Sequence, residues 1–309
     1  MELVWLLANK IAELSLAVLM GFLLVRRGVL QSKDTYQLSK VSLYIVSPCV
    51  VVSSFQMDYS PAVLHGLLFA FELALVLHIV LLLLARVLKK VLVLDELEQA
   101  VCVYSNSGNL IIPLVAAVFG QQWVIYACAY MAVQTVMFWT HLRVLFSGRG
   151  VLSLRKILFN INLMSIALGL TLFVLHIRLP SVLAGSLHNV GQMIGPMAMI
   201  MAGMLIASIP TRTLLTDRRI YLMSTLRLLA IPLVVLAFLK LVHAERWADN
   251  GQTIVLISFL AAISPSASTV TQMALLHGKD AVKASGIYGV TTVLCVLTMP
   301  LIIALYQWW

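Results

Sequence analysis

The chain has 309 residues, of which 61% are hydrophobic and 11% are charged, and its mean hydropathy is +1.01. A soluble domain of this length needs a larger share of polar residues to cover its surface, so the composition indicates an integral membrane protein. The net charge of +9 does not indicate nucleic-acid binding, because the basic residues fall between apolar segments rather than in one patch. The apolar segments are too long for the strands of an outer-membrane barrel.

Ten apolar segments are long enough to cross a bilayer as helices, which takes about 20 residues. The first segment lacks a basic region and a cleavage site, so we expect it to be a retained helix rather than a signal peptide. The cysteines lie inside these segments without metal-ligand spacing, so neither a metal nor a disulfide framework is expected. The predicted transmembrane helices cover residues 4–25, 37–56, 61–85, 99–119, 122–145, 157–177, 181–208, 220–242, 253–276 and 282–306.

Lysine and arginine are concentrated in every second loop. The poor loops hold only Arg178 and Arg246. Because loops rich in Lys and Arg face the cytoplasm, we expect the odd-numbered loops inside, both termini outside, and a location in the cell membrane. The rich loops contain Arg26, Arg27 and Lys33; Arg86, Lys89 and Lys90; Arg149, Arg155 and Lys156; Arg212, Arg218 and Arg219; and Lys279.

Glycine and proline recur at matching positions in two halves of the chain. Pro48 lies 27 positions after Gly21, and Pro196 lies 27 positions after Gly169. Gly120 and Gly278 close the fourth and ninth spans, which aligns residues 105–109 with 263–267. The spacing predicts a first five-helix repeat over 1–145, a cytoplasmic linker at 146–156 and a second repeat over 157–309. Because five is odd, the repeats are inverted relative to each other, as in many secondary transporters.

The fourth and ninth spans carry helix-breaking and polar residues near their midpoints. Gly108 weakens a helix, and Pro113 and Pro265 each remove a donor and clash with an earlier carbonyl. Freed backbone groups must be buried in protein or face a wet cavity, and the N-termini of broken helices suit an anion. We therefore predict that the breaks cross and bind substrate; the alternative is a proline kink whose serines only repair hydrogen bonds. The predicted site is Ser105, Asn106, Gly108, Asn109, Pro113, Gln134, Ser264, Pro265, Ser266, Ser268, Thr269 and Gln272.

Several of these polar residues have two interpretations. Asn106 and Asn109 could donate hydrogen bonds to a substrate carboxylate or cap the broken helix. Gln134 and Gln272 could line the cavity or bond a neighbouring helix. Glu72 lies well inside the third span, and we expect it to carry a proton during transport or to pair with a Lys or Arg.

Two further charged sites have structural interpretations. Lys10 and Glu13 are three residues apart, so they face one another on a helix and are expected to form an ion pair. Arg227 is expected to snorkel to the cytoplasmic edge, although it could instead attract anions towards the site.

Several motifs carry a resemblance to a known family. The ninth and tenth spans read SPSASTVTQMALLHGKDAVKASGIYGVTTVLCVLTMPL. With these motifs the chain resembles the auxin efflux carrier family, which includes plant auxin exporters and bacterial malonate and malate carriers. The family often has Gly where Ile111 stands and Asn where Thr269 stands. The matching residues are Pro48 in the second span; Asn106, Gly108, Pro113, Leu114 and Gly120 in the fourth; and Arg227 and Pro232 in the eighth.

The resemblance implies an all-α membrane fold of ten helices, similar to that of the bile-acid symporters, in which two inverted five-helix repeats cross at broken helices. Spans 1, 2, 6 and 7 would form a scaffold, and spans 3–5 and 8–10 a moving transport domain. It implies elevator-type secondary transport of small organic anions such as mono- or dicarboxylates, and a homodimer formed through the scaffold. Proton or sodium coupling is left open.

Other functions are less consistent with the residues. No phosphate-binding GxxxxGK[ST] motif is present, so neither a nucleotide engine nor a cofactor is expected. A membrane-embedded transferase needs clustered Asp, His or Cys near the membrane face, and the sequence has none, so an enzyme is not expected. The alternatives are a sodium-coupled organic-anion symporter and a membrane receptor or scaffold that does not transport.

Overall fold

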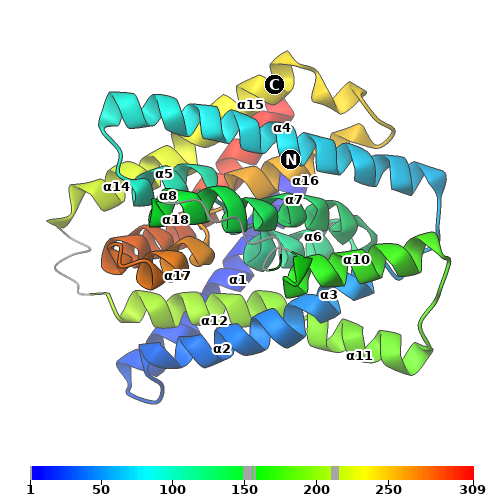
Figure 1. Ribbon diagram of the computed structural model, residues 1–309, viewed down its shortest axis with the longest axis horizontal. Coiled ribbons are helices and arrows are strands. Elements are labelled where there is room, and N and C mark those ends of the chain that lie inside the picture. The colour runs from blue at the N-terminus through cyan, green and yellow to red at the C-terminus, as the bar shows by residue number, and fades with distance from the viewer. Residues whose placement is uncertain (1, 149–154, 156–157, 210–215) are drawn as a thin grey trace.

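The computed structural model describes residues 2–148, 155, 158–209 and 216–309, which form an all-α protein (Figure 1). Within these ranges the only β-bridge is an isolated one between Ser105 and Ser266. The predicted linker at 146–156 lies largely outside the described residues. The α-helices of the first half are α1 (Glu2–Arg26), α2 (Thr35–Val41), α3 (Ser47–Ser54), α4 (Pro61–Leu92), α5 (Glu96–Val103), α6 (Ile112–Val118), α7 (Val124–Met137) and α8 (Arg143–Ser147).

The second half follows the same order of long and interrupted helices. Its helices are α10 (Ile161–Val174), α11 (Ser181–Gly191), α12 (Ile194–Ala207), α14 (Arg218–Thr225), α15 (Ile231–Leu241), α16 (Gly251–Ile263), α17 (Ser268–Leu276) and α18 (Ala281–Trp308).

Six described helical segments are long and apolar enough to cross a membrane, so the chain is a multi-pass membrane protein. Three shorter apolar helices cover Ser107–Val118, Ile161–Val174 and Gly251–Ile263. The arrangement of ten spans as an inverted repeat stays a prediction. The six long segments are Val4–Arg26, Pro61–Leu92, Gln121–Ser147, Ser181–Ala207, Arg218–Leu241 and Ala281–Trp308.

Three prolines inside helical segments each follow a π-helical turn. Pro48 follows η2 (Ser42–Val46), Pro113 follows η3 (Ser107–Ile111), and Pro232 follows η6 (Leu226–Ala230). A proline lacks a backbone donor and its ring clashes with the carbonyl four residues back. The wider turn relieves this conflict, so the helix continues where a tighter one would break.

The four predicted scaffold spans pack against one another. Helix α1 lies along α12, and α3 lies against both α10 and α11. Glycines allow the close approach: a Cβ on Gly21 would overlap the backbone of Ile200, and one on Gly203 would overlap that of Val18. Small residues at such crossings let membrane helices pack backbone to backbone.

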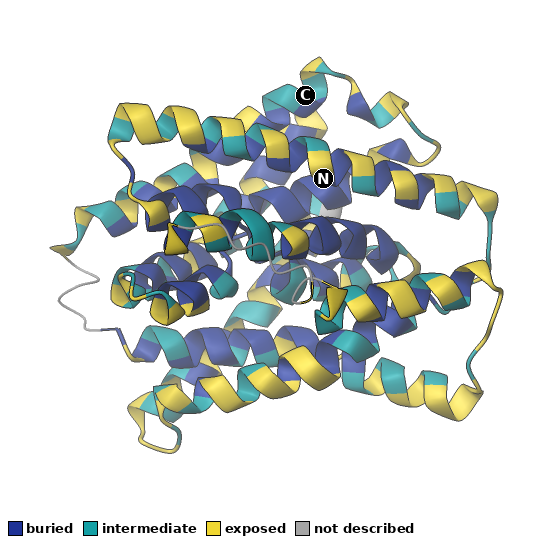
Figure 2. Cartoon of the chain, in the orientation of Figure 1, coloured by how far each residue is buried: buried dark blue, intermediate teal, exposed yellow. Residues whose placement is uncertain are grey.

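The central helices are α7 and α16, whose residues are almost all buried (Figure 2). Helix α4 crosses one side of the molecule, and α2, α3 and α11 lie along the opposite side (Figure 1). Many outward side chains of these peripheral helices are large and apolar, including Tyr36 of α2, Leu75 and Ile79 of α4, and Val182 of α11. Such a surface suits contact with lipid tails rather than water.

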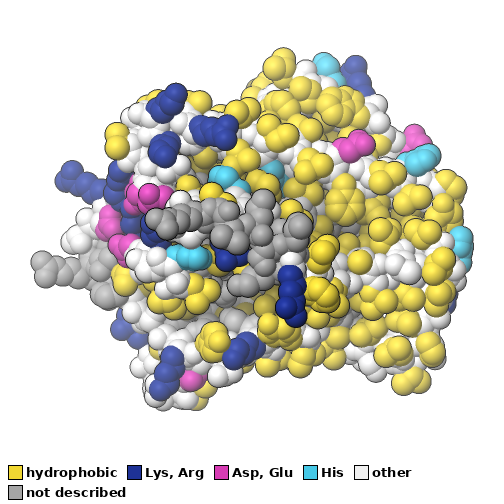
Figure 3. Space-filling model, viewed as in Figure 1, with side chains coloured by type: hydrophobic (Ala, Val, Ile, Leu, Met, Phe, Trp, Pro, Cys, Tyr) yellow, Lys and Arg dark blue, Asp and Glu magenta, His cyan; other side chains and the backbone are white. Residues whose placement is uncertain are grey.

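The two ends of the molecule differ in charge. Lys and Arg side chains gather at the end where α4 finishes and α14 begins, while the opposite end is mostly apolar (Figure 3). This agrees with the alternation of basic and poor loops along the sequence; which end faces the cytoplasm stays a prediction.

The predicted ion pair on α1 is confirmed, because Lys10 Nζ lies 2.7 Å from a Glu13 carboxylate oxygen.

Candidate functional site

The two interrupted helices cross through their extended segments. Helix α5 ends at Val103 and α16 ends at Ile263, and the residues that follow them take extended conformations. The Asn106 N–H donates to the Pro265 carbonyl at 2.8 Å, and the Ala267 N–H donates to the Tyr104 carbonyl at 3.2 Å. This reciprocal pair sets Ser105 beside Ser266 with local two-fold symmetry. The predicted crossing of the two breaks is therefore present, and we call these two segments, residues 104–106 and 264–267, the crossing.

The first break does not lie at Pro113, one of its predicted causes. Pro265 lies within its break, but Pro113 lies beyond η3 at the second residue of α6, where the π-turn accommodates it. Pro113 packs instead towards α12, since a Cβ on Gly195 would lie 2.7 Å from the Pro113 Cβ. The spacing of the sequence aligns Ser105 with Ile263. In the structure Ser105 pairs with Ser266, which lies three residues further along the chain.

Gln134 of α7 is buried and holds the first break. Its Oε1 accepts from the backbone N–H and the hydroxyl of Ser105, at 3.1 and 2.9 Å. Its Nε2 donates to the Ser105 carbonyl at 2.8 Å and to the Ser107 hydroxyl at 3.0 Å. A glutamine amide has two donors and two acceptor sites, so all of its capacity is used here. The geometry favours the interpretation in which Gln134 bonds a neighbouring segment.

A residue of α18 plays the corresponding part in the second break. The Ser266 N–H donates to the Thr291 hydroxyl at 3.3 Å, and Thr291 is fully buried. Each bridging serine therefore has its backbone N–H held by a polar side chain of the next long helix. An unpaired backbone group in hydrocarbon costs several kcal/mol, which explains why buried polar residues flank both breaks.

Arg227 lies at the centre of the site and is fully buried. Its Nε and Nη2 donate to the Ser264 carbonyl at 3.0 and 2.8 Å, Nη2 also donates to the Ala262 carbonyl at 2.6 Å, and Nη1 donates to the Cys102 carbonyl at 3.1 Å. The expectation that Arg227 snorkels to the membrane edge is wrong. The π-turn η6 carries the side chain inward, where one guanidinium joins the C-terminal ends of α5 and α16.

Three predicted polar residues remain partly accessible just beyond the crossing. Asn109, Ser268 and Thr269 are half-buried, and the Asn109 Nδ2 lies 3.2 Å from the Ser268 hydroxyl. They begin the second parts of both broken helices, so a ligand here would face two helix N-termini. Asn106 is buried beside them, and its Nδ2 has no hydrogen-bond partner among the described residues. Gln272 is exposed on α17 and is not brought into this group.

The structure places Glu72 away from the crossing. The residue is exposed on α4, on the same side as the exposed Leu75 and Ile79. The face of α4 that packs inward carries His78 instead, whose Nδ1 lies 2.7 Å from the Ala74 carbonyl. A proton-carrying role for Glu72 stays a prediction, and this geometry gives it no direct contact with the predicted site.

Several buried polar groups near the crossing were not identified from the sequence. The His78 ring lies 4.7 Å from that of Tyr130, and neither His78 Nε2 nor the Tyr130 hydroxyl has a partner among the described residues. The same is true of the Thr292 hydroxyl on α18. Thr292 and Tyr130 lie in helices whose mixture of small, aromatic and aliphatic residues gives no signal of which side faces inward.

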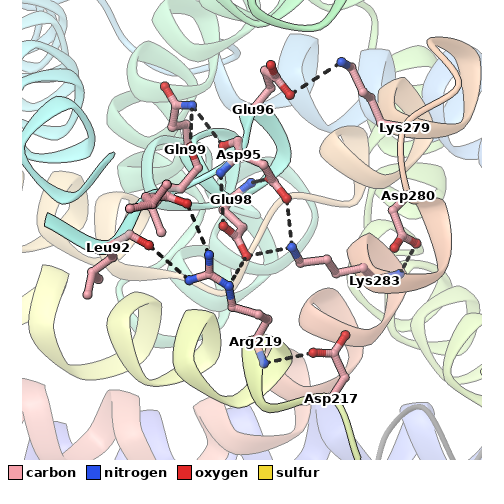
Figure 4. Close-up of polar contacts among 12 residues, drawn as sticks. Leu92, Asp95, Glu96, Glu98, Gln99, Asp217, Arg219, Lys279, Asp280 and Lys283 are labelled. Carbon is pink, nitrogen blue, oxygen red and sulfur yellow. Dashed lines mark hydrogen bonds and ion pairs between the residues drawn. The ribbon is translucent and has the colours of Figure 1, made fainter. Parts of the chain in front are cut away.

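A group of charged side chains holds the start of α5, and we call it the ionic cluster (Figure 4). Glu98 is fully buried, accepts a hydrogen bond from Lys283 Nζ at 2.6 Å and lies 3.3 Å from Arg219 Nε. Lys283 also donates to Asp95 at 2.8 Å, and Arg219 donates to the Leu92 carbonyl at 3.2 Å. The cluster joins α4, α5, α14 and α18 and fixes the half-helix that leads into the crossing.

A known protein family matches most of the chain. The sequence profile of a family described as membrane transport protein matches residues 6–153 and 150–303. A comparison with curated protein sequences finds no significant match. The matched family comprises membrane transporters and is not a class of enzymes. The two matches together cover most of the chain, which therefore belongs to the membrane transport protein family of auxin efflux carriers.

Proposed function

We propose that the protein is a secondary transporter that carries small organic anions, such as mono- or dicarboxylates, across the membrane. The observation that carries this proposal is the buried guanidinium of Arg227 at the crossing. Among the described residues Arg227 forms no ion pair with a carboxylate. A buried charge in a membrane protein is costly and usually functional, and a positive one without a fixed counter-ion favours a mobile anion.

The helix ends around the crossing favour the same charge. The C-terminal ends of α5 and α16 carry partial negative charge, but their carbonyls accept hydrogen bonds from Arg227. The N-terminal ends of η3 and α17 carry partial positive charge and lie beside the half-buried Asn109 and Ser268. An anion bound there would meet two positive helix ends, an amide donor and a hydroxyl. We propose Asn109, Ser268 and Thr269 as its direct contacts.

An inverted repeat accounts for several paired features. Gly21 and Gly169 are 148 residues apart, as are Pro48 and Pro196. Under this shift, the packing of α1 on α12 corresponds to that of α10 on α3, and both contacts are present. The hydrogen bond from the Ser105 N–H to Gln134 likewise corresponds to the hydrogen bond from the Ser266 N–H to Thr291. We propose two inverted five-helix repeats whose two-fold axis passes through the crossing.

Alternating access would then come from an elevator movement. In this proposal α1, α2, α3 and α10–α12 form the scaffold, and the helices that carry the crossing move as a unit. The contacts between α1 and α6, α12 and α18, and α3 and α7 would form the sliding surface. We also propose that the scaffold forms a homodimer and that both termini face outward.

The test is anion uptake by purified protein reconstituted in liposomes, with malonate, malate and indole-3-acetate as probes. Wild-type protein should give saturable uptake of at least one anion. Asn109→Ala should raise the half-saturating concentration about tenfold or more, because a hydrogen bond to a charged group contributes about 1.5–3 kcal/mol. Electroneutral exchange is detected by labelled counterflow, so absence of current alone does not decide the result.

The matched control is Asn189→Ala, because Asn189 is exposed on α11 far along the chain from either break. Its uptake should equal that of the wild type. A carrier with unchanged affinity in Asn109→Ala would contradict the proposed site. Correctly folded protein that moves no anion by uptake or counterflow across a broad carboxylate panel would contradict the proposed function and favour a receptor or scaffold.

A further inference from the structure

Arg227 occupies a position whose chemistry suits a small cation. Its three partners, the carbonyls of Cys102, Ala262 and Ser264, lie at the C-terminal ends of the first parts of both broken helices. In transporters with discontinuous helices, such carbonyls and unwound backbone are the groups that coordinate Na⁺ or attract a proton. Here a covalently attached guanidinium engages them at 2.6–3.1 Å.

The guanidinium nearly exhausts its donors on these carbonyls. Four hydrogen bonds leave from Arg227, and a guanidinium has five N–H groups. Its planar fork reaches both helices at once, which a lysine ammonium on a flexible chain would not match. The side chain therefore satisfies carbonyls that no other described residue is seen to bond, and it supplies one permanent positive charge between two negative helix ends.

We infer that Arg227 is a built-in cation that takes the place of a coupling metal ion, so that transport and stability need no Na⁺. This inference deepens the proposed transport function and rests on it for the transport measurement. Its charge consequence is specific: a site with one fixed positive charge becomes neutral with a monoanion and carries one net negative charge with a dianion. Net charge movement is then set by the substrate rather than by a co-transported cation.

The position of Arg227 in the chain supports a dedicated role. It is the second residue of η6, and Pro232 follows at the second residue of α15. The π-turn needed before this proline changes the direction of the side chains near it, and π-turns are frequent at functional sites. Arg227 is fully buried, and a charged side chain inside a membrane protein is costly and usually functional, so this position is unusual for an arginine with only a packing role.

The experiment compares wild type, Arg227→Ala and the control Arg27→Ala, in which an exposed arginine of the loop after α1 is removed. Unfolding temperature in detergent and anion uptake in liposomes are measured while Na⁺ is replaced by choline at constant ionic strength. Wild type and Arg27→Ala should show no Na⁺ response in either measurement. Arg227→Ala should unfold roughly 5 °C or more below wild type in choline, because buried carbonyls lose their cation.

In Arg227→Ala, Na⁺ or methylguanidinium should then raise the unfolding temperature saturably, recovering at least half of the loss, while choline should not. A purely structural arginine would give the loss without the Na⁺ response, and this result would overturn the inference. A saturable Na⁺ dependence of the wild type would also overturn it. If Arg227→Ala cannot be purified, Arg227→Lys replaces it: retained charge predicts no Na⁺ response, and a Na⁺ requirement would contradict the inference.

The two proposals fail separately. If the wild type moves no anion, the proposed function fails, but the unfolding temperatures still decide whether Arg227 fills a cation position. If the wild type moves anions only with Na⁺ present, the transport function stands and the built-in cation does not.

Discussion

Replacing Lys283 by Met is expected to lower the free energy of unfolding by about 3 kcal/mol, because it removes the closest cation from a carboxylate that is fully buried. Glu98 has no exposed side-chain surface, and Lys283 is 12% exposed. Arg219 stays near Glu98 at 3.3 Å, but its own side chain is 41% exposed and it is bonded to the end of α4. Thermal or denaturant unfolding of the purified protein measures the loss.

A double-mutant cycle separates the contribution of the ion pair to stability from the contribution of side-chain packing. Glu98→Leu with Lys283→Met removes both charges, so the double variant should be more stable than Lys283→Met alone. Lys279→Met is the matched control, since Lys279 lies 3.5 Å from the half-exposed Glu96, and it should cost less than about 1 kcal/mol. Equal losses for Lys279→Met and Lys283→Met would show that the buried pair has no special weight.

Gly203→Ala is expected to destabilise the protein by about 2–3 kcal/mol, at the upper end of the cost of overpacking. A Cβ at this position would overlap the Val18 carbonyl and lie 2.7 Å from the Phe22 amide nitrogen. Both are backbone atoms of α1, so no side chain can rotate away and the two helices must separate. The unfolding temperature should fall, and α1 should become more accessible to protease.

Gly185 of α11 provides the matched control. A Cβ on Gly185 would meet no atom within 4 Å, and the residue is exposed in a helix. Gly185→Ala should therefore be neutral or raise stability by up to about 1 kcal/mol, as alanine favours helix. A loss at Gly185 equal to that at Gly203 would mean that the close approach of α1 and α12 is not what the glycine provides.

The membrane class, the helical segments and the two breaks could be predicted because they depend on local composition. Long apolar runs with basic loops define the membrane helices, and the polar residues from Ser105 to Asn109 stand out within one of them. The location of the first break could not be predicted from Pro113. The π-turn η3 accommodates this proline, so the helix continues through it instead of breaking there. Sequence alone does not show which prolines are absorbed in this way.

The burial of single charged residues could not be read from the sequence. On α4 nearly every position is apolar, so no periodic pattern shows that His78 faces inward while Glu72 faces outward. Arg227 is two turns from Arg219 along one helix, which suggested a common membrane edge. Its hydrogen-bond partners are carbonyls at the ends of two other helices. These partners are far from Arg227 in the sequence, so local residue spacing does not indicate the contacts.

The distribution of ion pairs has a consequence for movement. In the described residues no ion pair joins a predicted scaffold helix to a predicted transport helix; the ionic cluster lies wholly within the transport group. The surface between the groups is formed by apolar and small residues, such as Gly195 against Pro113 and Gly289 against Ile206. Sliding along it would exchange one set of van der Waals contacts for another of similar energy, so the friction of the step would depend on lipid and temperature but little on ionic strength.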